Sequence, residues 1–262
     1  MTLGDDLAVR ALQLDVVGAG PAYTDRPGAT GAAYLVRHGS TAIVLDLGQG
    51  SFPRLAGAIE PSSLDAVVIS HLHPDHFIDL VALRHYLHWE FKPGRRVRVI
   101  APAGLSPRMD ALHDTPGFTA AALDVDDVTV GMTTVGDVTV EARRVTHTGD
   151  SHAYRVARAD GAGPGLVYTG DCGRAEDLDA LIQAGDTLLS EVSFGPGPVP
   201  PGGPHLDGSA VGQLADRTRV AAVLLTHLQM GYDDAETIDA VRDAYAGPVT
   251  LVAPGDRFTI GD

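Results

Sequence analysis

The sequence predicts an α/β (α+β) protein in which two mixed β-sheets pack face to face and helices cover their outer faces. Apolar, β-branched runs typical of buried strands alternate with helical patterns in both halves of the 262-residue chain. Stretches in which apolar and polar residues alternate lie between them and indicate antiparallel strands. Several of the apolar runs end in histidine or aspartate, so we expect their loops to gather along one edge of the sandwich.

The first half of the chain begins with a series of predicted strands. They cover residues 12–17, 32–37, 41–47, 67–69 and 97–102. The loop GAGPAYTDRPGATG (18–31) is rich in glycine, but it lacks the spacing of a dinucleotide-binding loop and a strand follows it, so we expect no nucleotide cofactor there. The glycines of LDLGQG (45–50) would permit close approach of a neighbouring backbone. Asp75 is placed to cap a helix that begins near His76.

The second half repeats this logic. Residues 125–145 alternate in short runs separated by Gly131 and Gly136, which predicts a β-meander. Three apolar strands then each lead into a residue that can bind a metal. They are 165–168 before Asp171, 186–190 before Glu191 and 220–225 before His227. Helices are predicted at 175–184, 209–218 and 235–245, and 248–254 is the last predicted strand.

Composition bounds the class of protein. Hydrophobic residues make up 44% of the chain, enough for the core of one globular domain over residues 1–262. The first ten residues carry acids where a signal peptide carries bases, and no segment approaches the roughly 20 apolar residues of a membrane span. The single cysteine, Cys172, allows no internal disulfide and is expected to be a small packing residue. We therefore expect a cytoplasmic protein without a membrane partner.

Net charge narrows the choice of partners. Nineteen Lys and Arg against 34 Asp and Glu give a formal net charge of −15. Such a chain repels nucleic-acid phosphates unless a basic patch dominates locally, and the densest basic run, KPGRRVR (92–98), is short. We expect no large nucleic acid as partner. A small anionic substrate held by metal ions in a pocket remains compatible with this charge.

The stretch VVISHLHPDHFIDL (67–80) carries the strongest chemical signal. An apolar strand leads into a loop that contains Pro74. The strand cannot continue through Pro74, because proline has no backbone N–H for the hydrogen bonds between strands. Four side chains on this loop can bind a metal: His71, His73, Asp75 and His76. Imidazole and carboxylate are the ligands that zinc, iron and manganese take from proteins, so this loop predicts a metal site.

Downstream motifs complete a resemblance to a known family. The cluster His71-x-His73-x-Asp75-His76, followed by His147, Thr169-Gly170-Asp171 and Leu225-Thr226-His227, resembles the metallo-β-lactamase superfamily over nearly the whole chain. VTHTGDSHAYRV (145–156), LVYTGDCG (166–173), LLSEVSF (188–194) and HLDGSAVGQLADRTRVAAVLLTHL (205–228) are more similar to the ribonuclease Z-like branch. Within it, the chain looks most like small actinobacterial proteins regarded as cyclic-nucleotide phosphodiesterases. The resemblance implies a four-layer αββα metallo-β-lactamase sandwich.

The resemblance also implies a centre of two divalent metal ions. His71, His73 and His147 would hold the first, Asp75, His76 and His227 the second, and Asp171 would bridge both. We expect zinc from the histidine-rich set, with manganese or iron as alternatives because carboxylates contribute. In the family mechanism a metal-bridging hydroxide attacks the substrate, and Asp75 and Asp171 would orient it.

Further residues of the site follow from the same resemblance. Ribonuclease Z-like enzymes have a histidine at the position of His205 beside the metals, where it stabilises developing charge or protonates the leaving oxygen; a structural loop role is the alternative. Glu191 would orient His205 or serve as a buried structural acid. Asp207 replaces the usual Thr or Ser and is expected to cap the following helix. His147, rather than His152, is the predicted third ligand.

We expect a phosphodiesterase that acts on a small substrate such as a cyclic nucleotide. Transfer-RNA-processing relatives insert a long substrate-gripping arm, whereas only RVARADGAGPGLV separates Tyr154 from Tyr168 here. Two alternatives stay open. One is hydrolysis of a carboxylic ester, lactone or thioester at the same site; the other is a mononuclear-iron oxidoreductase, against which the full set of seven ligands weighs. Members of the family often form dimers, and we expect a homodimer.

Overall fold

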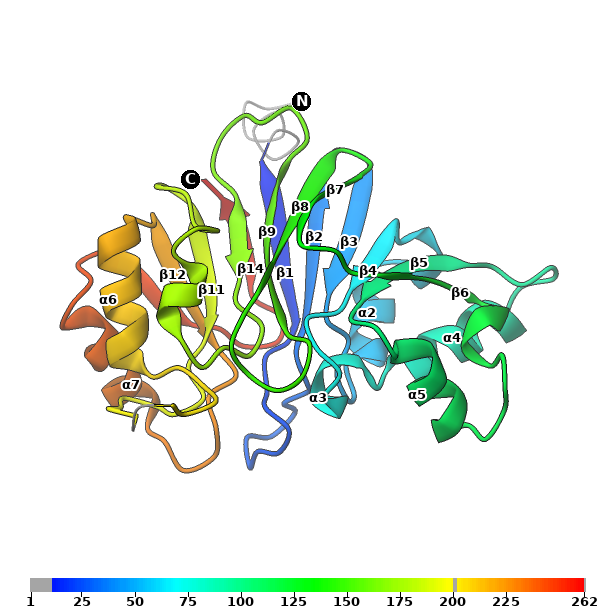
Figure 1. Cartoon of the computed structure of the whole chain (residues 1–262), viewed down its shortest axis with the longest axis horizontal. Helices are drawn as coiled ribbons and strands as arrows, with labels where there is room; N and C mark the ends of the chain where they lie inside the picture. The colour runs from blue at the N-terminus through cyan, green and yellow to red at the C-terminus, as the bar shows by residue number, and fades with distance from the viewer. Residues whose placement is uncertain (1–10, 200–201, 262) are drawn as a thin grey trace.

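The computed structural model describes residues 11–199 and 202–261, and it has four layers (Figure 1). The first sheet contains, in spatial order, β14 (Arg257–Ile260), β1 (Leu12–Gly18), β2 (Ala33–His38), β3 (Thr41–Leu45), β4 (Ala66–Val68), β5 (Val97–Ala101) and β6 (Leu123–Asp127). Strands β14, β1, β2 and β3 pair antiparallel, whereas β3 to β6 pair parallel, so the sheet is mixed.

The second sheet is also mixed. Its strands, in spatial order, are β13 (Val249–Leu251), β12 (Ala222–Thr226), β11 (Thr187–Glu191), β10 (Leu166–Tyr168), β9 (His152–Arg158), β8 (Val138–Arg144) and β7 (Gly131–Val135). Strands β10 to β13 pair parallel, and β7 to β10 pair antiparallel. Parallel strands require crossovers, which the helices of this chain supply.

Three apolar clusters hold the layers together. The central cluster lies between the two sheets and includes Tyr34 and Leu45 of the first sheet and Tyr154 and Tyr168 of the second. The first sheet's outer face packs on α2 (Phe52–Ala58), α4 (Leu80–Trp89) and α5 (Leu105–Leu112). The second sheet's outer face packs on α6 (Gly208–Thr218) and α7 (Asp234–Arg242). The predicted αββα sandwich is confirmed.

Pairing between distant segments overrides two local predictions. Residues 125–145 do not form one meander: β6 pairs with β5 in the first sheet, while β7 and β8 form a hairpin in the second. Alternation identifies a strand, but its partner depends on packing elsewhere. The strand predicted at 248–254 is shorter and is not the last one, because β14 follows and pairs with β1.

Two helix predictions are also corrected. The short helix α3 (Pro74–Phe77) follows His73, and the side chain of Asp75 does not cap it but approaches His227 instead. Within the predicted helix 175–184, only the 3-10 turn Ala175–Leu178 forms, and the following turns bury Leu181. Asp207 does cap α6, where its carboxylate accepts a hydrogen bond from the backbone N–H of Ala210. Among the described residues, no helix is long and apolar enough to cross a membrane.

Candidate metal centre

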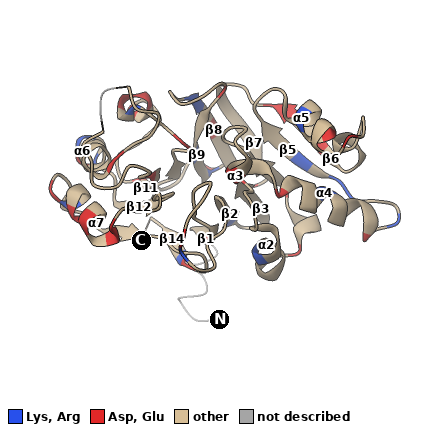
Figure 2. Ribbon diagram, turned by 90° about the horizontal axis from the view of Figure 1, so that it is seen from below, with Lys and Arg blue, Asp and Glu red and all other residues tan. Residues whose placement is uncertain are grey.

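Loops from both sheets meet at the edge that carries α3, which Figure 2 shows from below between the two sheets. His71 and His73 follow β4, Asp75 and His76 lie in α3, His147 lies between β8 and β9, Asp171 follows β10, and His227 follows β12. Loops at the ends of a rigid sheet are common positions for functional groups. The fold thus brings together residues that lie up to 156 positions apart, from His71 to His227.

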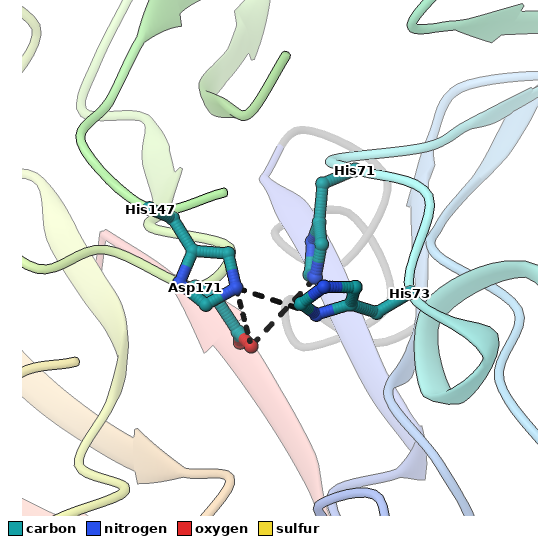
Figure 3. Close-up of side chains that lie close together, drawn as sticks. All are labelled: His71, His73, His147 and Asp171. Carbon is teal, nitrogen blue, oxygen red and sulfur yellow. Dashed lines mark hydrogen bonds and ion pairs between the residues drawn. The ribbon is translucent and has the colours of Figure 1, made fainter. Parts of the chain in front are cut away.

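The first group of converging side chains is shown in Figure 3 and consists of His71, His73, His147 and Asp171. One ligand atom of each lies within 4.8 Å of all the others. Nε2 of His147 is 3.4 Å from Nδ1 of His73. Oδ2 of Asp171 is 3.7 Å from Nε2 of His71 and 3.6 Å from Nε2 of His147.

The second group consists of Asp75, His76 and His227, which are all buried. Nε2 of His227 lies 3.2 Å from Oδ2 of Asp75 and 3.3 Å from Nε2 of His76. Oδ1 of Asp171 lies 3.3 Å from Nε2 of His76 and 3.6 Å from Nε2 of His227. Asp171 therefore presents one carboxylate oxygen to each group.

Each of the five histidines uses its other ring nitrogen in a hydrogen bond that points away from the centre. The acceptors are Ser70 Oγ for His71 (3.1 Å), Thr148 Oγ1 for His73 (2.9 Å), Asp46 Oδ2 for His76 (2.7 Å), the Pro204 carbonyl for His147 (2.8 Å) and Ser193 Oγ for His227 (2.9 Å). In a neutral imidazole, a ring N–H that donates outward leaves the inner nitrogen with a lone pair. Such partners fix the orientation and tautomer of metal-binding histidines.

These donors fit two divalent cations. Nε2 of His71 and Oδ1 of Asp171 are buried and have no hydrogen-bond partner among the described residues, which is unusual for buried polar atoms. Burial, followed by the charge of His76, lowers the pKa of His71 well below its usual range, so its imidazole is neutral. Burial would raise the pKa of Asp171, but the nearby His227 and His76 hold it well below its usual range. Neutral imidazoles and ionised carboxylates are the forms that bind metals.

Asp46 anchors the loop that carries the histidines, a role that sequence reasoning missed. It is fully buried, and its two carboxylate oxygens accept four hydrogen bonds. The donors are the backbone N–H of Ser70 (2.6 Å), the Ser70 hydroxyl (2.7 Å), His76 Nδ1–H (2.7 Å) and the Tyr168 hydroxyl (2.6 Å). Asp46 adopts a left-handed backbone with φ of 58°. The available sequence signal was an aspartate directly before LGQG. Nearby, a Cβ on Gly48 would lie 1.8 Å from the Asp75 carbonyl oxygen, which confirms the predicted close backbone approach.

Glu191 and His205 lie together beside Asp171. Nδ1–H of His205 donates to Oε1 of Glu191 at 3.1 Å and lies 3.8 Å from Asp171. Burial would lower the pKa of His205, but the hydrogen bond to Glu191 and its charge raise it. Oε2 of Glu191 accepts the Ser193 hydroxyl, which in turn accepts a hydrogen bond from His227. Glu191 thus orients His205 directly and His227 through Ser193.

The structure also places His152 and Cys172 relative to the centre. His152 lies outside both converging groups, while His147 belongs to the first. Cys172 is fully buried in the core of the second sheet's outer face, and burial raises the pKa of its thiol, so it acts as a packing residue.

Open cavities flank the centre on two sides. One, of about 410 Å³, is lined by His71, His73 and Arg108. The other, of about 510 Å³, is lined by Arg174 and His205. The first ligand group is therefore accessible from one cavity and His205 from the other.

Comparisons with known proteins place the fold and the family. The probable metallo-hydrolase YhfI of Bacillus subtilis is 25% identical over 254 residues, 93% of this chain and 98% of YhfI. The crystal structure of YhfI has the metallo-beta-lactamase fold. It matches the present structure with a TM-score of 0.84 and 20% sequence identity, over 95% of this chain and 99% of YhfI. The crystal structure of the short form of human tRNase Z matches with a TM-score of 0.70 and 18% identity, over 94% of this chain and 98% of that chain. A diphosphatase of the PhnP family matches with a TM-score of 0.71 and 14% identity, over 94% of this chain and 97% of that chain.

One further comparison confirms the predicted family. A family model described as the beta-lactamase superfamily domain matches residues 44–228, which span the histidine loop, Asp171 and His227. The same interval holds every side chain of the two converging groups. The chain therefore belongs to the beta-lactamase superfamily and is a metallo-hydrolase whose relatives include YhfI and the ribonuclease Z enzymes.

Proposed function

We propose that this protein is a dinuclear metal-dependent phosphodiesterase that hydrolyses small phosphodiesters such as cyclic nucleotides. The observation that carries the proposal is the pair of converging ligand groups joined by Asp171, whose two oxygens face one group each. The histidine-rich donor set favours zinc, and the carboxylates of Asp75 and Asp171 leave manganese and iron as alternatives.

The two ligand groups would hold two divalent ions, which would lower the pKa of a bound water and offset charge on the phosphoryl oxygens. The chain's own groups then act on defined atoms. The carboxylates of Asp75 and Asp171 accept hydrogen bonds from the attacking water and orient it toward phosphorus. Nδ1–H of His205 donates a hydrogen bond to Glu191. The protonated Nε2 of His205 is therefore free to donate its proton to the leaving oxygen.

A small substrate is favoured over RNA by the connection between β9 and β10. Only residues 159–165 join these strands, too few for the arm with which transfer-RNA-processing enzymes grip their substrate. The formal charge of −15 also disfavours an extended nucleic acid. Phosphate-ester chemistry is supported by the fold likeness to the diphosphatase of the PhnP family and to tRNase Z.

A hydrolysis screen tests the proposal. Zinc- or manganese-loaded protein is assayed on bis-p-nitrophenyl phosphate and on 3′,5′- and 2′,3′-cyclic nucleotides. We expect turnover that Asp75→Ala and His147→Ala abolish, while His152→Phe, a change at the histidine outside both groups, retains it. Turnover of p-nitrophenyl esters, lactones or thioesters without any phosphodiester turnover would overturn the proposal in favour of carboxylic-ester chemistry.

A further inference from the structure

Arg108 differs from most arginines of this acidic protein. Most of the described arginines pair with carboxylates, as Arg96 does with Asp124 and Arg98 with Asp126. Arg108, on α5, has no carboxylate partner among the described residues, although it lies at the edge of the metal centre. Within the described part of the chain, its guanidinium makes one hydrogen bond, from Nη1 to the backbone carbonyl of Leu72.

That hydrogen bond links the exposed Arg108 side chain to the loop that carries the metal ligands. Leu72 is the residue between His71 and His73, and its side chain packs partly buried against the core of the first sheet. A guanidinium carries five N–H donors, so one bond to a carbonyl leaves an edge able to bind an anion at two points. Anchoring also reduces the rotational entropy that the long side chain would lose on binding.

The cavity in front of Arg108 opens directly onto the first ligand group. It measures about 410 Å³, and His71, His73 and Thr148 share its wall with Arg108. Of the described residues that line it, one is an acid, Asp150, which is paired with Arg144 at 2.8 Å. Arg108 is therefore the charged side chain of this cavity that no described opposite charge offsets.

We propose that Arg108 forms a second anion site, which binds a phosphate or carboxylate of the substrate that is not hydrolysed. The inference rests on the proposed phosphodiesterase function and specifies its substrate: a small phosphodiester that carries a further anionic group. The metal centre holds the reacting phosphoryl group, and the guanidinium holds the other anion across the cavity. Arg108 thereby selects for substrates with two charged groups in a chain whose net charge of −15 repels anions elsewhere.

The test compares substrates that differ in one group. Adenosine 2′,3′-cyclic phosphate is assayed with and without a 5′-phosphate, and a p-nitrophenyl aryl phosphodiester with and without an aryl carboxylate. For wild type we expect kcat/KM to favour one anionic member by roughly tenfold or more, since a charge-assisted bond is involved. The pair in which this preference is found shows whether Arg108 binds a phosphate or a carboxylate. Arg108→Ala should lower this ratio to near one, and Arg108→Lys should restore it in part.

A matched control is Arg54→Ala, which removes another exposed arginine without a described carboxylate partner. Its guanidinium also donates a hydrogen bond to a backbone carbonyl, that of Gly28, but it lines neither cavity beside the metal centre. The Arg54→Ala protein should keep the wild-type ratio. A wild type that does not distinguish the members of either pair, or an Arg108→Ala protein that loses activity equally on both members, would overturn the proposal. The second result would mean that Arg108 only supports the loop at Leu72.

A binding measurement separates this proposal from the proposed function. Calorimetry of metal-loaded protein with adenosine 3′,5′-bisphosphate and adenosine 3′-monophosphate needs no turnover. We expect the bisphosphate to bind roughly tenfold more tightly, and Arg108→Ala to remove that difference. If no phosphodiester is hydrolysed but this difference is found, the anion site stands and the reaction assigned to it fails. Equal affinities in the wild type would overturn a phosphate site at Arg108.

Discussion

Replacing Asp46 with asparagine should weaken both the fold and the metal centre. Oδ2 of Asp46 accepts three hydrogen bonds of 2.6–2.7 Å, from Ser70, His76 and Tyr168, and Oδ1 accepts one from the Ser70 backbone. Asparagine tolerates the left-handed backbone at φ 58°, so the exchange does not strain the chain. In the better of its two orientations, the asparagine oxygen replaces Oδ2 and keeps three hydrogen bonds. Its NH2 group then replaces Oδ1, so the Ser70 N–H loses its acceptor.

The size of the effect follows from this count. One buried donor left without an acceptor, with the other three bonds losing the carboxylate charge, costs about 3–5 kcal/mol of unfolding free energy. His76 also loses the charged acceptor that orients its ring, which should weaken zinc binding by about 10–100-fold.

Urea unfolding of the metal-free protein and zinc titration against a competing chelator measure the two effects. Asp65→Asn is the control, because Asp65 accepts one hydrogen bond from the Ala42 backbone on the same sheet and lies outside the metal loop. We expect the control to lose about 1 kcal/mol or less and to bind zinc normally. An Asp46→Asn protein that matched this control in both assays would refute the reasoning.

Three further predictions concern other parts of the molecule. Ser193→Ala removes the hydroxyl that accepts a hydrogen bond from His227, so we expect roughly tenfold weaker binding of one metal in a zinc titration. Burial lowers the pKa of His152, so the folded state binds a proton less readily than the unfolded chain. Stability should therefore fall as pH drops below about 6.5, and His152→Phe should remove up to about 1.4 kcal/mol of this loss per pH unit in denaturant titrations at several pH values. Arg155→Met leaves the buried Asp186 without its bidentate partner and should cost about 3–5 kcal/mol in thermal unfolding. Arg158→Met, which breaks a more exposed pair with Asp160, should cost far less in the same assay.

The ligands on the histidine loop could be predicted from the sequence because their signal is local, whereas the full set of seven was implied by the family resemblance. His71, His73 and His76 crowd one loop directly after an apolar strand, and His147 and His227 each follow a recognisable strand. Strands that are apolar on both faces, as in this sandwich, can also be recognised in the sequence without knowledge of their neighbours. The layer order followed from the alternation of strands and helices.

The partners of those ligands could not be found in this way. Ser193 and Thr148 are ordinary hydroxyl residues whose roles depend on His227 and His73, which lie 34 and 75 positions away. Asp46 gave only a faint signal, because an aspartate before glycines more often marks a turn. Likewise, the capping role expected for Asp75 failed because the tertiary contact with His227 outweighs a local cap.

Metal stoichiometry measured together with turnover tests the central claim most directly. Metal-free protein is titrated with zinc while bound metal per chain and hydrolysis of bis-p-nitrophenyl phosphate are followed in the same samples. The two ligand groups joined by Asp171 predict two zinc ions per chain, with turnover that rises as the second binds. Saturation at one ion per chain, or full turnover with one ion bound, would contradict a dinuclear phosphodiesterase.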